Sequence, residues 1–488
     1  MNWIAIYPEI FLLVLACVVM LVDLFVKDTQ HRLSYWLTVA GLLVLAVLCG
    51  LYFASGMRQL AMARALIVDP MAMLLKLFAV LATVVTLVYS RRYAIERRMW
   101  GGEMFSLVLL SLLGQFIMIS GNNLLTIYLG LELLSLALYA LVALRRDHTQ
   151  STEAAMKYFV LGALASGFLL YGMSMLYGAT GSLDLVTIFR IIAVEPVNRA
   201  VLVLGVVFIV AGLAFKLGAV PFHMWIPDVY QGAPTAVVLM VGGAPKLAAF
   251  GMAIRLLVEG MFPLAMDWQG MLVVLAVLSI GLGNLAAIAQ TNLKRMLAYS
   301  TIAQIGFVLL ALLSGMLNGN ALSASTAYSG AMFYLVIYVL TTLGTFGVIL
   351  LLAREGFEAE DIRDFAGLAK TDPWMAGVMT FLLFSLAGIP PFAGFYAKLE
   401  VLTILFNTGR IWLVVYSVIL SVIGAFYYIR VVKVMYFDTP TALSASRARG
   451  AGGARALLSL NGLAVLALGL MPGGLMTLCY QAIATTLH

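Results

Sequence analysis

The residues most able to do chemistry in this chain are charged side chains that lie inside strongly apolar stretches. Near the middle of one such stretch, Glu132 stands in the run Leu129-Gly-Leu-Glu-Leu-Leu134. One charge at the centre of a bilayer costs about 2.5–3.5 kcal/mol. We therefore expect each charge that cannot reach the surface to have a partner or a function. Eight basic residues lie inside the apolar stretches: Lys76, Lys157, Lys216, Lys246, Arg255, Lys398, Arg430 and Lys433.

Some of these residues have a simple interpretation. Arg255, Arg430 and Lys433 lie within about one or two turns of a predicted helix end, so their long side chains are expected to extend to the membrane surface. Lys157 follows Glu153 by four residues, which favours an ion pair on the helix surface. Nothing in the sequence explains Lys76.

The remaining charges form a candidate proton relay of Glu132, Lys216, Lys246 and Lys398. Lys246 lies near the centre of its apolar stretch, next to Pro245. Burial favours the neutral form of a lysine, whereas a nearby carboxylate favours its charged form. A row of lysines that faces one acid can therefore pass a proton through coupled charge states. A purely structural ion-pair role is the alternative.

Lys157 and His223 are candidate auxiliaries of this relay. His223 follows Pro221 closely, and an imidazole titrates near neutral pH, so His223 could bridge lysines through water. Ordinary packing of the imidazole is an equally open interpretation.

The composition requires a membrane around the chain. Of its 488 residues, 63% are apolar and 10% are charged, and the mean hydropathy is +1.05. Soluble domains have about 45–50% apolar and about 25% charged residues. Alternating strand patterns are absent, so we predict an all-α integral membrane protein. The run from Met1 to Phe25 contains Glu9 and Asp23 and is predicted to be the first spanning helix rather than a signal peptide.

The cysteines argue against a metal or redox centre. Cys17, Cys49 and Cys479 lie far apart in apolar stretches and form no CxxC or Cys/His cluster. Iron–sulfur, haem c and structural zinc sites therefore have no evident ligands. No basic stripe with interleaved aromatic residues indicates nucleic-acid binding.

The apolar stretches predict about fourteen transmembrane helices. Their approximate spans are 3–26, 33–54, 67–90, 104–120, 123–144, 152–178, 200–230, 235–258, 270–289, 294–315, 326–353, 373–406, 410–436 and 456–485.

The seventh and twelfth spans are too long for one plain helix, and each has prolines in its middle: Pro221 in one, and Pro390 with Pro391 in the other. Proline removes a backbone donor and clashes with the preceding turn, so both spans should be broken inside the membrane. Interrupted helices at corresponding positions indicate inverted repeats. We predict two inverted five-helix repeats, helices 4–8 and 9–13, with discontinuous helices 7 and 12. Simple proline kinks are the alternative.

We treat the chain as one polytopic domain, 1–488. It consists of helices 1–3 (1–100), repeat one (101–260), repeat two (261–440) and helix 14 (441–488). Loops after odd-numbered spans contain sixteen Lys and Arg, and loops after even-numbered spans contain five. The positive-inside rule then puts the odd loops in the cytoplasm and both termini outside.

Several motifs resemble the antiporter-like subunits of the proton-translocating NADH–quinone oxidoreductase, respiratory complex I. The most specific is AFKLGAVPFHMWIPDVYQGAPT at 214–235, which is similar to the signature of the subunit N family. Subunit M usually has a glutamate where this chain has Lys398, and subunit L ends in a lateral amphipathic helix that this chain lacks. Further similarities are YPEI at 7–10, KYF at 157–159, KRMLAYS at 294–300 and GIPP at 388–391.

The resemblance implies a role for each relay residue. Glu132 would pair with Lys216, Lys246 would be the central relay, and Lys398 would be the exit-side lysine. Lys157 would modulate Lys216. The subunit would bind no cofactor, since NADH and quinone are used elsewhere in the complex.

The resemblance also implies a setting in the cell. The chain would be a multi-pass protein of the bacterial inner membrane. Its partners would be the neighbouring antiporter-like subunit M, the small subunits K and J, and the lateral helix of subunit L. Two other functions stay open: a subunit of a multisubunit Na⁺/H⁺ antiporter or related energy-converting complex, and a purely scaffolding subunit.

Overall fold

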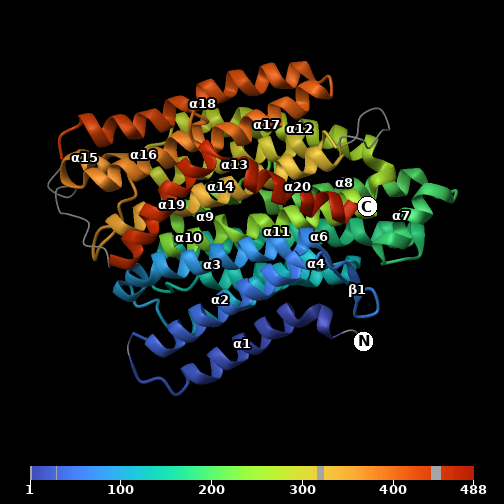
Figure 1. The fold of residues 1–488 in the computed structure, drawn as a ribbon, viewed down its shortest axis with the longest axis horizontal. Helices are drawn as coiled ribbons and strands as arrows, with labels where there is room; N and C mark the ends of the chain where they lie inside the picture. The colour runs from blue at the N-terminus through green and yellow to red at the C-terminus, as the bar shows by residue number, and fades with distance from the viewer. Residues whose placement is uncertain (1–2, 29, 316–323, 441–451, 488) are drawn as a thin grey trace.

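The computed structural model describes residues 3–28, 30–315, 324–440 and 452–487. The chain is nearly all helical, which confirms the predicted all-α fold, and its helices pack side by side from α1 at one edge to α18 at the other (Figure 1). Among the described residues, thirteen helices are long and apolar enough to cross a membrane. The broken span at 373–407 adds a fourteenth crossing.

The first half contains α1 (Tyr7–Asp23), α2 (Arg32–Ala54), α3 (Pro70–Glu96), α4 (Gly102–Ser120), α5 (Leu124–Val142), α6 (Thr149–Thr180), α7 (Leu185–Val194), α8 (Arg199–Leu217), α9 (Trp225–Gly232), α10 (Thr235–Gly242) and α11 (Ala244–Ala253). The second half contains α12 (Ala265–Ile288), α13 (Leu293–Leu312), α14 (Ala324–Leu352), α15 (Leu368–Thr371), α16 (Pro373–Ala387), α17 (Ala393–Asn407), α18 (Ile411–Phe437), α19 (Gly452–Leu470) and α20 (Gly473–Leu487). Shorter elements are the 3₁₀ turns η1 (Ile4–Ile6), η3 (Phe262–Leu264) and η4 (Ile362–Phe365), the π-helix η2 (Ile254–Gly260), and a hairpin of β1 (Gln59–Ala61) and β2 (Leu66–Val68).

The seventh and twelfth spans are broken, as predicted. The seventh consists of α8 and α9, and the twelfth consists of α16 and α17. Each first half ends at a glycine in the left-handed region, Gly218 at φ 86° and Gly388 at φ 82°. Glycine adopts this conformation without a steric penalty, and the prolines that follow cannot resume the helix at once.

Two further interruptions lie in spans that the sequence analysis did not single out. The eighth span is divided at Gly243 into α10 and α11 and then continues as the π-helix η2. The last span is divided at Met471 and Pro472 into α19 and α20. Arg447 and Arg449, which contribute to the predicted cytoplasmic charge, lie outside the described residues.

Two matching backbone bridges support the predicted repeats. Asn123 caps α5 and bridges to Asp184, and Asn292 caps α13 and bridges to Asp361. Both bridges join the start of the second helix of a repeat to the connection that follows the third. The two connections contain α7 and α15, which lie at opposite ends of the bundle (Figure 1). This placement is what an inverted arrangement requires.

The first two helices of each repeat pack closely through glycine. A Cβ atom on Gly114 of α4 would lie 2.5 Å from the backbone nitrogen of Leu134 in α5. A Cβ atom on Gly283 of α12 would lie 2.7 Å from the backbone nitrogen of Ala303 in α13. Small residues at such contacts let membrane helices approach closely. These close contacts bring the polar side chains of α5 and α13 into the interior of the bundle.

Candidate functional site

Lys246 lies at the break of the seventh span. Its side chain is 1% exposed, and its Nζ donates to the carbonyl oxygen of Leu217, the last residue of α8, at 2.7 Å. The indole nitrogen of Trp225 donates to the carbonyl of Phe215 at 3.0 Å, and the Lys246 ammonium lies 5.4 Å from the centroid of the Trp225 ring. The last carbonyls of a helix lack internal partners and carry its negative end, so they attract a cation.

Lys398 has the same relation to the second break. Its Nζ donates to the carbonyl oxygen of Ala387, the last residue of α16, at 3.0 Å, and lies 5.3 Å from the centroid of the Phe307 ring. In both breaks a lysine therefore donates a hydrogen bond to the carbonyl oxygen of the residue just before the glycine with positive φ. The interrupted backbone supplies the negative charge density that a buried ammonium needs.

Lys216 and Glu132 do not touch each other directly. Lys216 is 7% exposed and donates to the hydroxyl of Ser135 on α5 at 3.0 Å. Glu132 lies one turn away on the same helix and accepts a hydrogen bond from Ser166 of α6. Among the described residues no ion pair joins Glu132 to Lys216. Their predicted pairing stays a prediction.

A buried network of neutral polar side chains connects the second break to α13, and the sequence analysis missed it. Gln304 donates to the carbonyl of Leu386 at 2.9 Å and to the hydroxyl of Tyr428 at 3.1 Å, and it accepts from Tyr334. The signal in the sequence was a set of polar residues at helical spacing inside apolar spans. The other bonds are Ser300 with Tyr428 at 2.5 Å and Tyr338 with Thr301 at 2.8 Å.

Comparison with known proteins assigns the chain to a family. The sequence profile described as NADH:quinone oxidoreductase/Mrp antiporter, TM, matches residues 121–424. NADH-quinone oxidoreductase subunit N of Polaromonas naphthalenivorans is 58% identical over 487 residues, which is 99% of this chain and 97% of the relative. The subunit N of Herminiimonas arsenicoxydans is also 58% identical, over 100% of this chain and 99% of the relative. The chain belongs to the subunit N family.

Solved membrane-protein structures have a similar fold. A chain of respiratory complex I from Thermus thermophilus with bound aureothin is 32% identical to this chain, with a TM-score of 0.81. The match covers 96% of this chain and 98% of that one. A chain of the Mrp complex from Dietzia has a TM-score of 0.86 at 21% identity and shares the fold.

Among the described residues, Lys157 and His223 have no hydrogen bond or ion pair with Lys246 or Lys398. The Lys157 Nζ is 2.8 Å from the Glu153 carboxylate, as the four-residue spacing predicted, and 2.9 Å from Asp228 of α9. Asp228 also binds Arg295 at 2.8 Å, so Lys157 belongs to a polar cluster at one end of the bundle. His223 is half-buried in the break, and its Nδ1 is buried without a hydrogen-bond partner among the described residues.

The expectation that Arg255 extends to the surface is wrong. Its side chain is fully buried and binds Asp69 at 2.7 Å, Glu259 at 2.5 Å and the carbonyl of Ile119 at 3.0 Å. Asp69 is itself buried at the start of α3, where it also caps the helix. Arg255 therefore neutralises acidic groups inside the protein, which removes its need to reach water.

The other two residues expected near the surface differ from each other. Lys433 is 61% exposed and pairs with Asp438, which confirms its expected position. Arg430 is half-buried and donates to the carbonyls of Ile288 at 2.8 Å and Gln290 at 2.6 Å at the end of α12. It stabilises a helix end rather than extending freely.

Lys76, which the sequence left unexplained, has a buried acidic partner. It forms an ion pair with Glu9 of α1, and the two side chains are 0% and 8% exposed. The Lys76 ammonium also lies 5.2 Å from the centroid of the Phe116 ring. The pair ties the N-terminal helix to α3 and α4.

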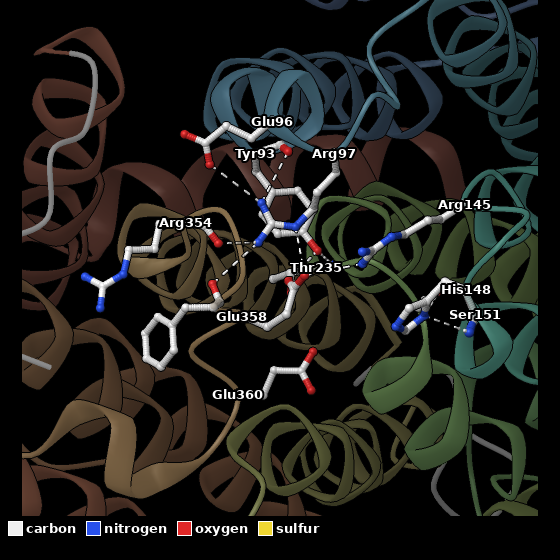
Figure 2. A network of polar contacts seen from close by, with 12 residues as sticks. Tyr93, Glu96, Arg97, Arg145, His148, Ser151, Thr235, Arg354, Glu358 and Glu360 are labelled. Carbon is white, nitrogen blue, oxygen red and sulfur yellow. Dashed lines mark hydrogen bonds and ion pairs between the residues drawn. The ribbon is translucent and has the colours of Figure 1, made fainter. Parts of the chain in front are cut away.

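The connection between α14 and α16 is fixed to the end of α3 and to repeat one by a polar network (Figure 2). Glu358 accepts from the hydroxyl of Tyr93 and the guanidinium of Arg97, both at 2.8 Å, and from Arg145 at 3.3 Å. The Tyr93 hydroxyl also accepts from the backbone nitrogen of Thr235, the first residue of α10. Burial alone would raise the pKa of Glu358, but the hydrogen bonds and charge of Arg97 outweigh it and hold that pKa below its usual range.

No group of three or more His, Cys, Asp or Glu side chains that could hold a metal ion occurs among the described residues.

Proposed function

We propose that the chain is a proton-translocating membrane subunit of an NADH:quinone oxidoreductase. Relatives of that name match it over nearly their full length. One observation carries the proton-transfer role: Lys246 and Lys398 each place an ammonium on the last carbonyl of an interrupted helix. A lysine in this position can release its proton to a neighbouring site, since the carbonyl partner carries no full charge.

In repeat one, transfer depends on charges that influence one another. Glu132 and Ser135 lie one turn apart on α5, and Ser135 accepts from Lys216, so the carboxylate and the ammonium occupy neighbouring sites. The Lys216 ammonium is held by the neutral hydroxyl of Ser135, and the Lys246 ammonium lies 3.5 Å from the Lys216 carbonyl oxygen. Two ammonium groups in adjoining sites repel each other, so protonation of one promotes release from the other. Lys157 and His223 act as auxiliary residues of this relay.

In repeat two, the polar network of α13 carries the proton onward. Gln304 binds the carbonyl of Leu386, and the next carbonyl, that of Ala387, accepts from Lys398. Hydroxyl groups can accept and donate a proton in turn, so Tyr428 and Ser300 provide transfer steps. We assign the remaining gaps between these side chains to water, and Lys398 to the exit side.

The reactions of the whole complex supply the free energy for proton translocation. We infer that NADH and quinone react in other subunits and that this chain contributes no redox cofactor. Its neighbours are the antiporter-like subunit M, the small subunits K and J, and the lateral helix of subunit L. We place it in the bacterial inner membrane with both termini on the periplasmic side, and its repeats at 101–260 and 261–440.

The test replaces relay residues one at a time in the assembled complex. We expect Glu132→Ala, Lys216→Ala and Lys246→Ala each to lower NADH-driven proton uptake by membrane vesicles, with assembly intact on native gels. Lys433→Ala is the matched control, because Lys433 is also a helix lysine but is exposed. Unchanged pumping, or a complex that fails to assemble, would show that these charges are structural. Sodium-dependent exchange in the absence of NADH would instead favour an antiporter.

A further inference from the structure

A groove of about 650 Å³ opens between α2, α3, α14 and α19. Its walls are mainly apolar: Val39 of α2, Val88 of α3, Leu350 and Leu351 of α14, and Leu457 and Leu458 of α19 among others. An apolar channel between membrane helices, open on one side, accommodates acyl chains. It does not fit an ion or a polar metabolite.

One end of the groove is polar and cationic. Arg91, Arg92 and Glu96 of α3 line it, together with Gln30, Tyr35 and Trp36. Arg92 is already paired, because its Nε lies 2.7 Å from the Glu96 carboxylate. Arg91 lies 4.7 Å above the Tyr35 ring and has no acidic partner among the described residues. The groove therefore ends in one guanidinium whose charge is unmatched.

The position of this end is that of a membrane surface. α2 and α19 begin there, and α3 and α14 end there. The same end of the bundle carries Arg97, Arg145 and Arg354 (Figure 2). Trp36 is 59% exposed on the outer side of α2, and exposed tryptophans and tyrosines mark the headgroup level of a bilayer.

We propose that this groove binds a phospholipid whose headgroup has a net negative charge that faces Arg91 and whose acyl chain lies along α19. Charge complementarity decides the occupant. The unmatched arginine requires an anion, and the apolar walls require a hydrocarbon chain on the same molecule. Basic pockets between transmembrane helices are known to select anionic lipids in this way. This inference is independent of the proposed proton relay.

The experiment uses the intact complex in nanodiscs and a phosphatidylglycerol with a diazirine in one acyl chain. After illumination, labelled peptides are mapped by mass spectrometry, and a phosphatidylcholine with the same chains serves as the reference probe. We expect phosphatidylglycerol to label the start of α19 and the end of α3 more strongly than phosphatidylcholine does. One basic residue near the membrane surface contributes about 1 kcal/mol, so Arg91→Gln should lower this labelling about fivefold. Arg91→Lys should largely retain it.

Arg98→Gln is the control, because Arg98 is exposed near the same end but does not line the groove. It should leave the labelling unchanged, and native gels should show that every variant assembles. Inorganic phosphate should not compete, since it has no acyl chain. Equal labelling by the two lipids, undiminished labelling of Arg91→Gln, competition by phosphate, or a polypeptide cross-linked in the groove would each overturn the proposal.

Discussion

The buried Glu9–Lys76 pair allows a sharp test of how the N-terminal helices are held. The perturbation is a double-mutant cycle of Glu9→Leu, Lys76→Met and both together. Each single change leaves one charge without a partner in a site where the two side chains are 8% and 0% exposed. The double change instead fills the site with apolar groups of similar size.

The structure sets the expected magnitudes. Loss of one partner of a buried ion pair costs about 3–5 kcal/mol, whereas replacement of both partners by apolar residues is about neutral or stabilising. Lys76→Met also removes the cation–π contact with Phe116, which contributes about 0.5–2 kcal/mol. We therefore expect each single variant to be clearly less stable than the double variant, with Lys76→Met the least stable.

The assay is thermal denaturation of the full chain in the complex, followed as the fraction of folded subunit after heating. The control is the same cycle on the exposed pair Lys433 and Asp438, 2.7 Å apart, for which about 0–1 kcal/mol is expected. Two results would refute this reasoning: additive losses of stability from Glu9→Leu and Lys76→Met, or a double variant that is the least stable of the three. Either would mean that the two buried charges do not compensate each other.

Three further predictions concern other charges. Arg255→Leu leaves Asp69 and Glu259 without their cation, so it should destabilise the chain by about 3–5 kcal/mol in the same thermal assay; a neutral effect would contradict a buried ionic cluster. The folded-state pKa of Glu358 is lowered, so its stabilisation is present above the unfolded pKa, about 4.3, and is lost as pH falls through the folded value. Glu358→Gln should therefore lower the melting temperature at pH 7, and a difference from the wild type that does not shrink below about pH 4 would contradict this. Lys398→Ala should reduce NADH-driven pumping less than Lys246→Ala if proton exit has a second route, and equal losses would argue for a single exit.

The sequence predicted those parts of the candidate site whose residue types are energetically unfavourable in a membrane helix. A lysine in an apolar span is anomalous on its own, and glycine followed by proline interrupts a helix wherever it occurs. Lys246, Lys398 and the two breaks were therefore found without a structure. That each lysine would bind the last carbonyl of α8 or α16 could not be predicted, because the direction of a side chain depends on how the helices pack.

The errors and omissions have related causes. Arg255 binds Asp69 from 186 positions earlier in the chain, so its position near a helix end said nothing about its partner. The hydroxyl and amide groups around Gln304 are tolerated in any membrane helix, and they become a network only when α13, α14 and α18 meet. Neutral polar residues therefore give a weaker signal than charges.

The opposed directions of the two broken spans have an electrical consequence. Four crossings lie between the seventh and twelfth spans, so α8 and α16 traverse the bilayer in opposite senses. Each has a dipole equivalent to about half a charge at either end. A voltage across the membrane stabilises one of these dipoles by about as much as it destabilises the other. The effects of a membrane voltage on the two dipoles therefore nearly cancel in the resting fold. A voltage can favour one half of the protein over the other only through a charge that moves, such as a proton.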